Sequence, residues 1–118
     1  MKVYNVIGNI LDIEIVSDTV MPDDIKKIES VMEKMLNQYD KISIRITLGR
    51  HLEMTLKTQL EVLKAGIQMH QYIHRLAVIG DRNVLKLLTA VDNLVVPWQE
   101  KYFHIDDLEQ AEIWLKED

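Results

Sequence analysis

The chain of 118 residues lacks cysteine altogether and has one phenylalanine, two prolines and four glycines. Without cysteine it has no disulfide, no thiolate nucleophile and no sulfur ligand for zinc, and it suits a reducing compartment. The glycines stand singly, which excludes a glycine-rich phosphate loop; they are Gly8, Gly49, Gly66 and Gly80. Neither a nucleophile elbow nor a paired acidic motif is present, so the sequence favours a noncatalytic protein.

Long apolar runs and basic clusters are also missing. The N-terminal segment has only a short apolar run, interrupted by Asn5, Asn9 and Asp12, so neither a signal peptide nor a membrane span is expected. Lysine and arginine together number 14 against 19 aspartates and glutamates, which gives a net charge of -5 without any basic stripe. We therefore expect a cytoplasmic protein that does not bind nucleic acid.

The length predicts a single domain over residues 1–118, large enough to bury roughly two-thirds of the surface of its unfolded chain. Its centre is the stretch from Lys41 to Lys64, in which a strand leads through a short loop into a helix. Apolar and polar residues alternate in the strand, and the apolar ones are Ile42, Ile44, Ile46 and Leu48. From Thr55 onward, apolar residues recur at helical spacing, and we expect this stripe to cover the isoleucine face; it consists of Leu56, Leu60, Leu63 and Ile67.

Further elements flank this centre. Residues 3–7 and 10–16 favour two strands joined by a hairpin turn at Gly8-Asn9. A helix is expected from Pro22, a strand at 76–79, a helix from Asp81 to Val91, a strand at 101–105 and a helix at 107–115. The order ββαβαβαβα predicts an α/β fold with a mostly parallel five-stranded sheet and one antiparallel edge strand.

Polar residues on two strands bear on where the helices lie. Asp12 and Glu14 alternate with apolar residues in the second strand, as Arg45 does in the central one. Strands covered by helices on both faces are normally apolar throughout, so we expect the helices mainly on one face. Asp12 and Glu14 should then be accessible to solvent and within reach of Arg45. Such a sheet steps in one direction and has no crevice for a dinucleotide.

Three short segments, together with the order of elements, carry a resemblance to a known family. They are IGD at Ile79–Asp81, EKYF at Glu100–Phe103 and AEIWL at Ala111–Leu115. The chain resembles the SpoIIAA-like group of small bacterial proteins, which are related to STAS domains, over nearly its whole length. This resemblance implies successive βα units that step as a superhelix, a fold shared with anti-sigma-factor antagonists and with lipid-carrying CRAL-TRIO domains.

The resemblance also directs attention to the start of the helix after the central strand. STAS-type antagonists are switched by phosphorylation of a Ser or Thr in an Asp-Ser pair at this place. The corresponding segment here, GRHLEMTLKT, has no such pair, and Thr55 is the nearest possible phospho-acceptor. Threonine is also a routine N-cap, and capping is the interpretation we favour for Thr55.

More apolar residues occur than one sheet face needs. Beside the main stripe of the second helix lies another set, formed by Val62, Gly66, Met69 and Ile73. The loop LVVPW at 94–98 adds Val95, Val96 and Trp98. Together they form a dimer interface, a ligand pocket or ordinary core. His70 and His74 have the spacing of two metal ligands, but a third ligand would have to come from His51, His104 or a distant acid, and no metal is predicted.

The sequence thus predicts a noncatalytic STAS-like regulatory or protein-interaction module without a cofactor. We expect it to act as a homodimer or with a regulatory protein partner. An alternative is a carrier or sensor of a small apolar, lipid-like ligand, suggested by the CRAL-TRIO relationship and the methionine-rich helices. A small enzyme or metal-binding protein is the third hypothesis.

Overall fold

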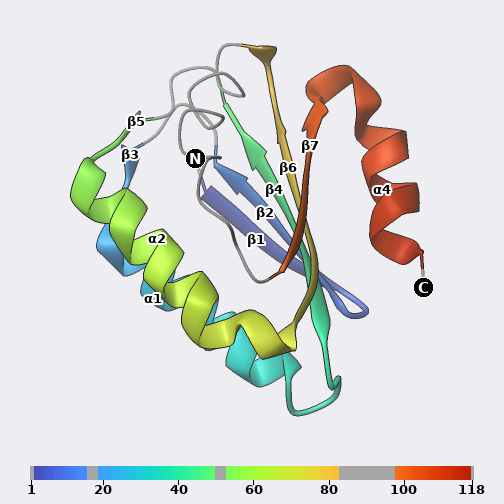
Figure 1. Cartoon of the computed structure of the whole chain (residues 1–118), viewed down its shortest axis with the longest axis horizontal. Helices are drawn as coiled ribbons and strands as arrows, with labels where there is room; N and C mark the ends of the chain where they lie inside the picture. The colour runs from blue at the N-terminus through green and yellow to red at the C-terminus, as the bar shows by residue number, and fades with distance from the viewer. Residues whose placement is uncertain (1, 16–18, 50–52, 83–97, 118) are drawn as a thin grey trace.

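The computed structural model of the chain describes residues 2–15, 19–49, 53–82 and 98–117. A five-stranded sheet runs through these residues in the order β1-β2-β4-β6-β7 (Figure 1). Its strands are β1 (Lys2–Ile7), β2 (Ile10–Ile15), β4 (Ile42–Leu48), β6 (Ile73–Gly80) and β7 (Gln99–His104). The first pair is antiparallel and the other three pairs are parallel, as predicted.

Three helices and several short elements complete the described chain. The helices are α1 (Pro22–Met35), α2 (Leu56–Met69) and α4 (Leu108–Lys116). Two-residue strands β3 (Thr19–Val20) and β5 (Glu53–Met54) pair in parallel just before α1 and α2, and the 3-10 turns are η1 (His70–Tyr72) and η2 (Ile105–Asp107). The helix predicted from Asp81 to Val91 lies outside the described residues apart from its first two positions.

Local chemistry accounts for the hairpin and for the start of α1. Gly8 has a φ of +59°, a left-handed conformation that glycine adopts without strain, and it allows the tight turn between β1 and β2. Pro22 occupies the first turn of α1, where its missing N–H leaves no bond unmade. Asp24 Oδ2 accepts a hydrogen bond of 2.8 Å from the backbone N–H of Met21, which closes the first turn.

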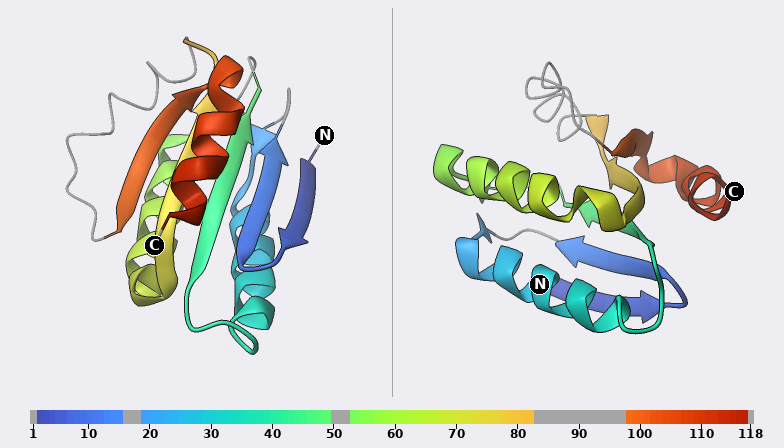
Figure 2. Two further views of the ribbon diagram at one scale, coloured as in Figure 1. Left: turned by 90° about the vertical axis from the view of Figure 1, so that its right-hand side faces the viewer. Right: turned by 60° about the horizontal axis from the view of Figure 1, so that its bottom comes forward.

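The helices α1 and α2 cover one face of the sheet, and α4 packs on the opposite face (Figure 1, Figure 2). Most of the described helical residues therefore lie on one side, as expected. The expectation that Asp12 is accessible to solvent was wrong, since only 6% of this residue is exposed. Its carboxylate is buried because Arg45, on the neighbouring strand, pairs with it; Glu14 is exposed as predicted.

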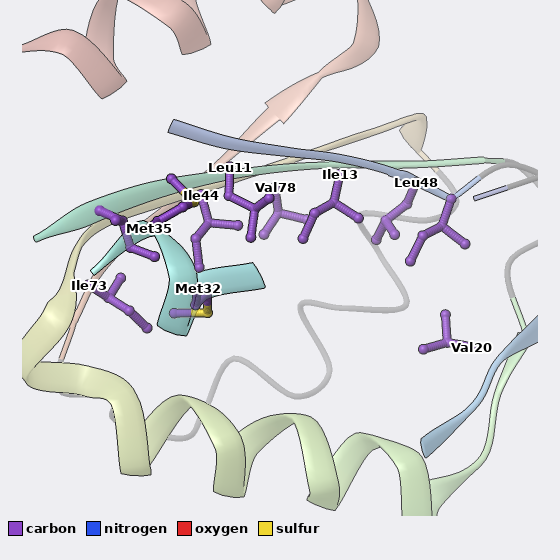
Figure 3. Close-up of a cluster of buried hydrophobic side chains, with 11 residues drawn as sticks. Leu11, Ile13, Val20, Met32, Met35, Ile44, Leu48, Ile73 and Val78 are labelled. Carbon is purple, nitrogen blue, oxygen red and sulfur yellow. The ribbon is translucent and has the colours of Figure 1, made fainter. Parts of the chain in front are cut away.

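The main core lies between the sheet and the pair α1 and α2. Leu11 and Ile13 of β2, together with Ile44 and Leu48 of β4, point from the sheet toward the layer of helices, and Met32 of α1 belongs to the same cluster (Figure 3). A second, smaller cluster joins the sheet to α4, and its buried members are Ile10, Ala77, Ile79, Phe103, Ala111 and Leu115. β6 thus contributes apolar side chains to both faces, as its wholly apolar segment 76–79 allows.

The orientation of α2 differs from the prediction. Leu56, Leu60 and Ile67, which we expected to cover the isoleucine face, are all exposed. The side chain of Leu63, the fourth member of that stripe, is outside the described part. The inward side of α2 holds Thr58, which is 2% exposed, and the half-buried Met69. The helix is therefore rotated about its axis relative to the prediction.

Candidate interaction surface

Thr55 fixes the start of α2. Its side chain accepts a hydrogen bond of 3.1 Å from the backbone N–H of Thr58, which is the geometry of an N-cap. The two hydroxyl oxygens, Thr55 Oγ1 and Thr58 Oγ1, are also 3.0 Å apart. The capping role of Thr55 is confirmed. Because Thr58 is buried, this small network also sets which side of the first turn faces the core.

Gly66 sets the rotation of α2 near its other end. A Cβ at this position would lie 2.5 Å from Trp98 Cη2 and 2.9 Å from Trp98 Cζ3, closer than real carbon atoms approach. The indole ring therefore packs directly on the helix backbone. Only glycine leaves room for it, so the Gly66 side of α2 is tied to Trp98, the residue immediately before β7.

Trp98 is held by a carboxylate on β7. Glu100 Oε1 accepts a hydrogen bond of 3.3 Å from Trp98 Nε1, and Glu100 Oε2 accepts one of 2.9 Å from the hydroxyl of Tyr102. All three side chains are half-buried and lie on the sheet face that α1 and α2 cover. Glu100 thus orients both aromatic rings against the core, a role that the sequence did not indicate.

The opposite side of α2 is apolar and faces solvent. Leu56 is 71% exposed, Leu60 58% and Ile67 49%, and their spacing of four and seven residues places them on one face of the helix. We call these three residues the outer stripe. Lys57, Glu61 and Lys64 are exposed as well and follow one flank of the stripe. An apolar row with a charged border is a typical feature of a surface that binds another protein.

The residues predicted to form an interface or ligand site occupy different environments. Ile73 was expected on the second helix, but α2 ends at Met69 and Ile73 is the first residue of β6, where it is buried in the main core. Met69 and Trp98 pack against that core while remaining partly accessible. Val62 is exposed on α2. Val95 and Val96 lie outside the described residues. Gly66 and Trp98 are brought together, whereas Val62 does not lie on the outer stripe.

The described histidines have local structural roles, and His70 and His74 do not share a helix, because His70 lies in η1 and His74 in β6. His70 Nδ1 lies 2.7 Å from the carbonyl oxygen of Ile67 at the end of α2, and His74 Nε2 lies 3.4 Å from the carbonyl oxygen of Glu117. His104 Nδ1 accepts a hydrogen bond of 3.2 Å from the backbone N–H of Asp106. His51 is outside the described part. Within residues 2–15, 19–49, 53–82 and 98–117, no group of three potential ligands could hold a metal ion.

The sheet face on which α4 packs carries a charge pair with two hydrogen bonds. Arg45 donates from Nε to Asp12 Oδ1 at 3.0 Å and from Nη2 to Asp12 Oδ2 at 2.9 Å. These bonds are the main reason that the pKa of Arg45 lies above its ordinary value, and they outweigh the opposing effect of burial. Both charges are satisfied by each other, so this pair holds β2 and β4 in register and needs no ligand.

Arg75 anchors the end of α4 to the sheet. Its guanidinium donates from Nη1 to the carbonyl oxygen of Trp114 and from Nε to Gln99 Oε1, the latter at 3.2 Å. It also lies over the Trp114 ring, 5.2 Å from the centroid, and 3.5 Å from a Glu117 carboxylate oxygen. A cation at a helix C-terminus is favourable because the last carbonyls carry partial negative charge. Arg75 is therefore structural.

The fold agrees with the comparison to known proteins. The family described as SpoIIAA-like matches residues 10–116 of this chain. The chain belongs to the SpoIIAA-like family. A crystal structure of an uncharacterized protein from the DUF3478 family of Shewanella loihica PV-4, with a SpoIIAA-like fold, is similar to it with a TM-score of 0.68 and 22% identity. That similarity covers 98% of this chain and 92% of the other, and at this identity it bears on the fold alone.

Membership of the SpoIIAA-like family supports a regulatory or interaction module as the general class, without a specific role. No curated protein matches the chain. None of the helices in the described ranges has the length and apolar character that crossing a bilayer requires. The surface feature that most directly indicates a specific role is the exposed outer stripe of α2.

Proposed function

We propose that this SpoIIAA-like protein is a noncatalytic interaction module and that the outer stripe of α2 is its binding surface. The exposure of Leu56, Leu60 and Ile67 carries this proposal. Single exposed apolar residues are common on protein surfaces and need no explanation. Three in one row on one helix are different, because burying such a row against a partner removes a contiguous apolar area from water.

The shape of the surface favours a protein partner over a small apolar ligand. The outer stripe lies along the convex side of a helix, whereas sites for small molecules are concave and enclose most of the ligand. On the flank of α2 that carries Gly66, Trp98 fills the space above the helix backbone. A helix that presents residues at i, i+4 and i+11 fits instead the groove or the helix of another protein.

A lysine substitution on the outer stripe tests this proposal against a matched control. Leu60→Lys changes a residue that is 58% exposed, and Ile113→Lys changes one that is 57% exposed on α4, across the sheet. Neither change should alter the melting temperature, because surface substitutions usually change stability by less than about 0.5 kcal/mol. Leu60→Lys should reduce the binding of a fluorescent apolar dye more than Ile113→Lys does.

Two results would contradict the proposal that the outer stripe is a binding surface. If, at protein concentrations too low for self-association, Leu60→Lys lowered the melting temperature strongly while Ile113→Lys did not, Leu60 would be packed inside the molecule in solution. The outer stripe would then be core, and the proposal would be withdrawn. Equal dye binding by both variants and the wild-type protein would also contradict it.

A further inference from the structure

Resting on the proposed function, we infer that the occupant of the outer stripe is a second copy of this chain. In this arrangement the α2 helices of two copies pack antiparallel across a twofold axis that passes near the middle of the helix. Two features of α2 favour it, the symmetry of the apolar stripe and the order of charges along one flank. Both are self-complementary in the antiparallel orientation.

The two end residues of the stripe lie almost symmetrically about the centre of the helix. Leu56 lies at the first position of α2 and Ile67 near its last turn, so their midpoint falls close to the middle of Leu56–Met69. In an antiparallel pair, Leu56 of one copy then faces Ile67 of the other, and the reverse contact is made at the same time. A twofold interface requires such reciprocal contacts, because the same patch serves both subunits.

The charged flank has the same centre. Glu61 and Lys64 are exposed on one side of the stripe, and their midpoint is also near the middle of α2. When two helices pack antiparallel, equivalent flanks face each other. Glu61 of each copy then meets Lys64 of the other copy, so this ion pair forms twice. Lys57 meets the uncharged Gln68. Opposite charges thus face each other in the register that the apolar residues select.

A parallel pair lacks this complementarity. Leu56 would face its own equivalent, and the flank with Glu61 would face the opposite flank, where Gly66 lies under Trp98. The helix dipoles would also align, which is unfavourable, whereas they oppose each other in the antiparallel pair. The antiparallel orientation is therefore the one that we test.

The size of the contact predicts concentration-dependent association. A helix of 14 residues is about 21 Å long, and an interface confined to one such helix falls at the low end of known interface sizes. We expect monomer and dimer to exchange, and sedimentation velocity over a range of protein concentrations should show both.

The absence of cysteine allows a clean cross-linking test. Leu56→Cys and Ile67→Cys are prepared as separate variants, one with a size tag, and are oxidised alone and as a mixture. The mixture should give a disulfide between the two variants, because these positions face each other. Each variant alone should give little, since like residues would be separated by about 16 Å along the helix axis, too far for a disulfide. Ile113→Cys reports the background from random collisions.

The result that overturns the inference is a mixed disulfide no more abundant than the Ile113→Cys background. Rapid cross-linking of Leu56→Cys alone would instead indicate a parallel pair and would equally overturn it. If the wild-type protein is monomeric at high micromolar concentration, the second copy is excluded. The dye experiment with Leu60→Lys would still decide separately whether the outer stripe is an exposed apolar surface in solution.

A charge exchange gives an independent measurement that introduces no cysteine. Glu61→Lys and Lys64→Glu should each weaken self-association by about tenfold, because each brings like charges together twice. Mixing the two variants should restore association, since each Lys of one then faces a Glu of the other. Circular dichroism should stay unchanged in both. Failure of the mixture to associate better than either variant alone would count against the antiparallel register.

Discussion

Replacing Gly66 with alanine changes the contact that sets the rotation of α2. The added methyl group would lie 2.5 Å from Trp98 Cη2 and 3.2 Å from Trp98 Cζ2, so the indole ring has to move. Movement is resisted because Trp98 Nε1 donates to Glu100 and because the ring packs against the main core. The substitution therefore probes whether the inward side of α2 is correctly placed.

Two opposing effects determine its magnitude. Adding a methyl group to a packed site destabilises a protein by about 1–3 kcal/mol. Alanine is also the better helix former, and an interior Gly→Ala change stabilises a helix by about 1 kcal/mol. The net effect of Gly66→Ala in the wild-type protein is thus a loss of about 0–2 kcal/mol. In a Trp98→Leu background the clash is removed, and the same change should stabilise by about 1 kcal/mol.

The assay is a double-mutant cycle measured by urea unfolding. Four proteins are compared: wild type, Gly66→Ala, Trp98→Leu and the double variant. Far-UV circular dichroism follows unfolding in all of them, and Trp114 remains as a fluorescent probe in the variants without Trp98. The coupling energy should be about 1–3 kcal/mol, because the clash occurs only when the added methyl group and the indole ring are both present.

Additivity would refute the reasoning. Substitutions at sites that do not touch add to within about 0.5 kcal/mol. If the effect of Gly66→Ala were the same in both backgrounds within that limit, Trp98 would not pack on Gly66 in solution. The inward side of α2, and with it the assignment of the outer stripe to solvent, would then have to be revised.

Three other predictions concern the cap and the charges. Thr55→Ala should destabilise the protein by about 1 kcal/mol in urea unfolding, whereas Thr55→Asp should have little effect because aspartate also caps. Arg45→Met should cost about 3 kcal/mol because it leaves Asp12 buried and unpaired, and Asp12→Leu combined with it should recover most of the loss. A hydrogen bond from Lys116 holds the pKa of Glu112 below its usual value. This contribution to stability is present above the unfolded-state pKa and is lost as the pH falls through the folded-state pKa. The difference in stability between wild type and Glu112→Gln should therefore shrink in acid, and an NMR titration should show a lowered pKa for Glu112.

The topology could be predicted because several local signals agree. Gly8-Asn9 marks the hairpin, Pro22 marks the start of α1, and the alternation from Ile42 to Leu48 marks the central strand. Once these elements are placed, the rule that connections are short and right-handed leaves few arrangements of the sheet. The strand order β1-β2-β4-β6-β7 follows from them.

The position of α4 was harder to predict because polar residues on a strand normally indicate an open sheet face. Asp12 and Arg45 neutralise each other across two strands, so their face can be partly covered by a helix. Ala77 and Ile79 indicate that this face of the sheet is covered, because both are buried in the cluster beneath α4. They belong to an apolar segment whose other residues, such as Val78, face the main core, and a strand that is apolar on both sides is buried on both sides.

The rotation of α2 could not be obtained from periodicity at all. Leu56, Leu60 and Ile67 form one apolar stripe, and Val62 and Met69 belong to another on a different side of the helix. The hydrophobic periodicity is satisfied whichever of the two stripes faces the core. The choice depends on residues that carry no hydrophobic signal.

Those residues are a glycine and a threonine. Gly66 admits the Trp98 ring only on its own side of the helix, and Thr58 is buried beside the cap formed by Thr55. Both contacts are specific in distance, whereas burying a leucine stripe is favourable against any apolar surface. These close contacts therefore decide which side of α2 enters the core. The outer stripe, which could pack against any apolar surface, is left facing outward. This division explains how one helix can hold the monomer together on one side and keep three large apolar residues available to a second molecule on the other.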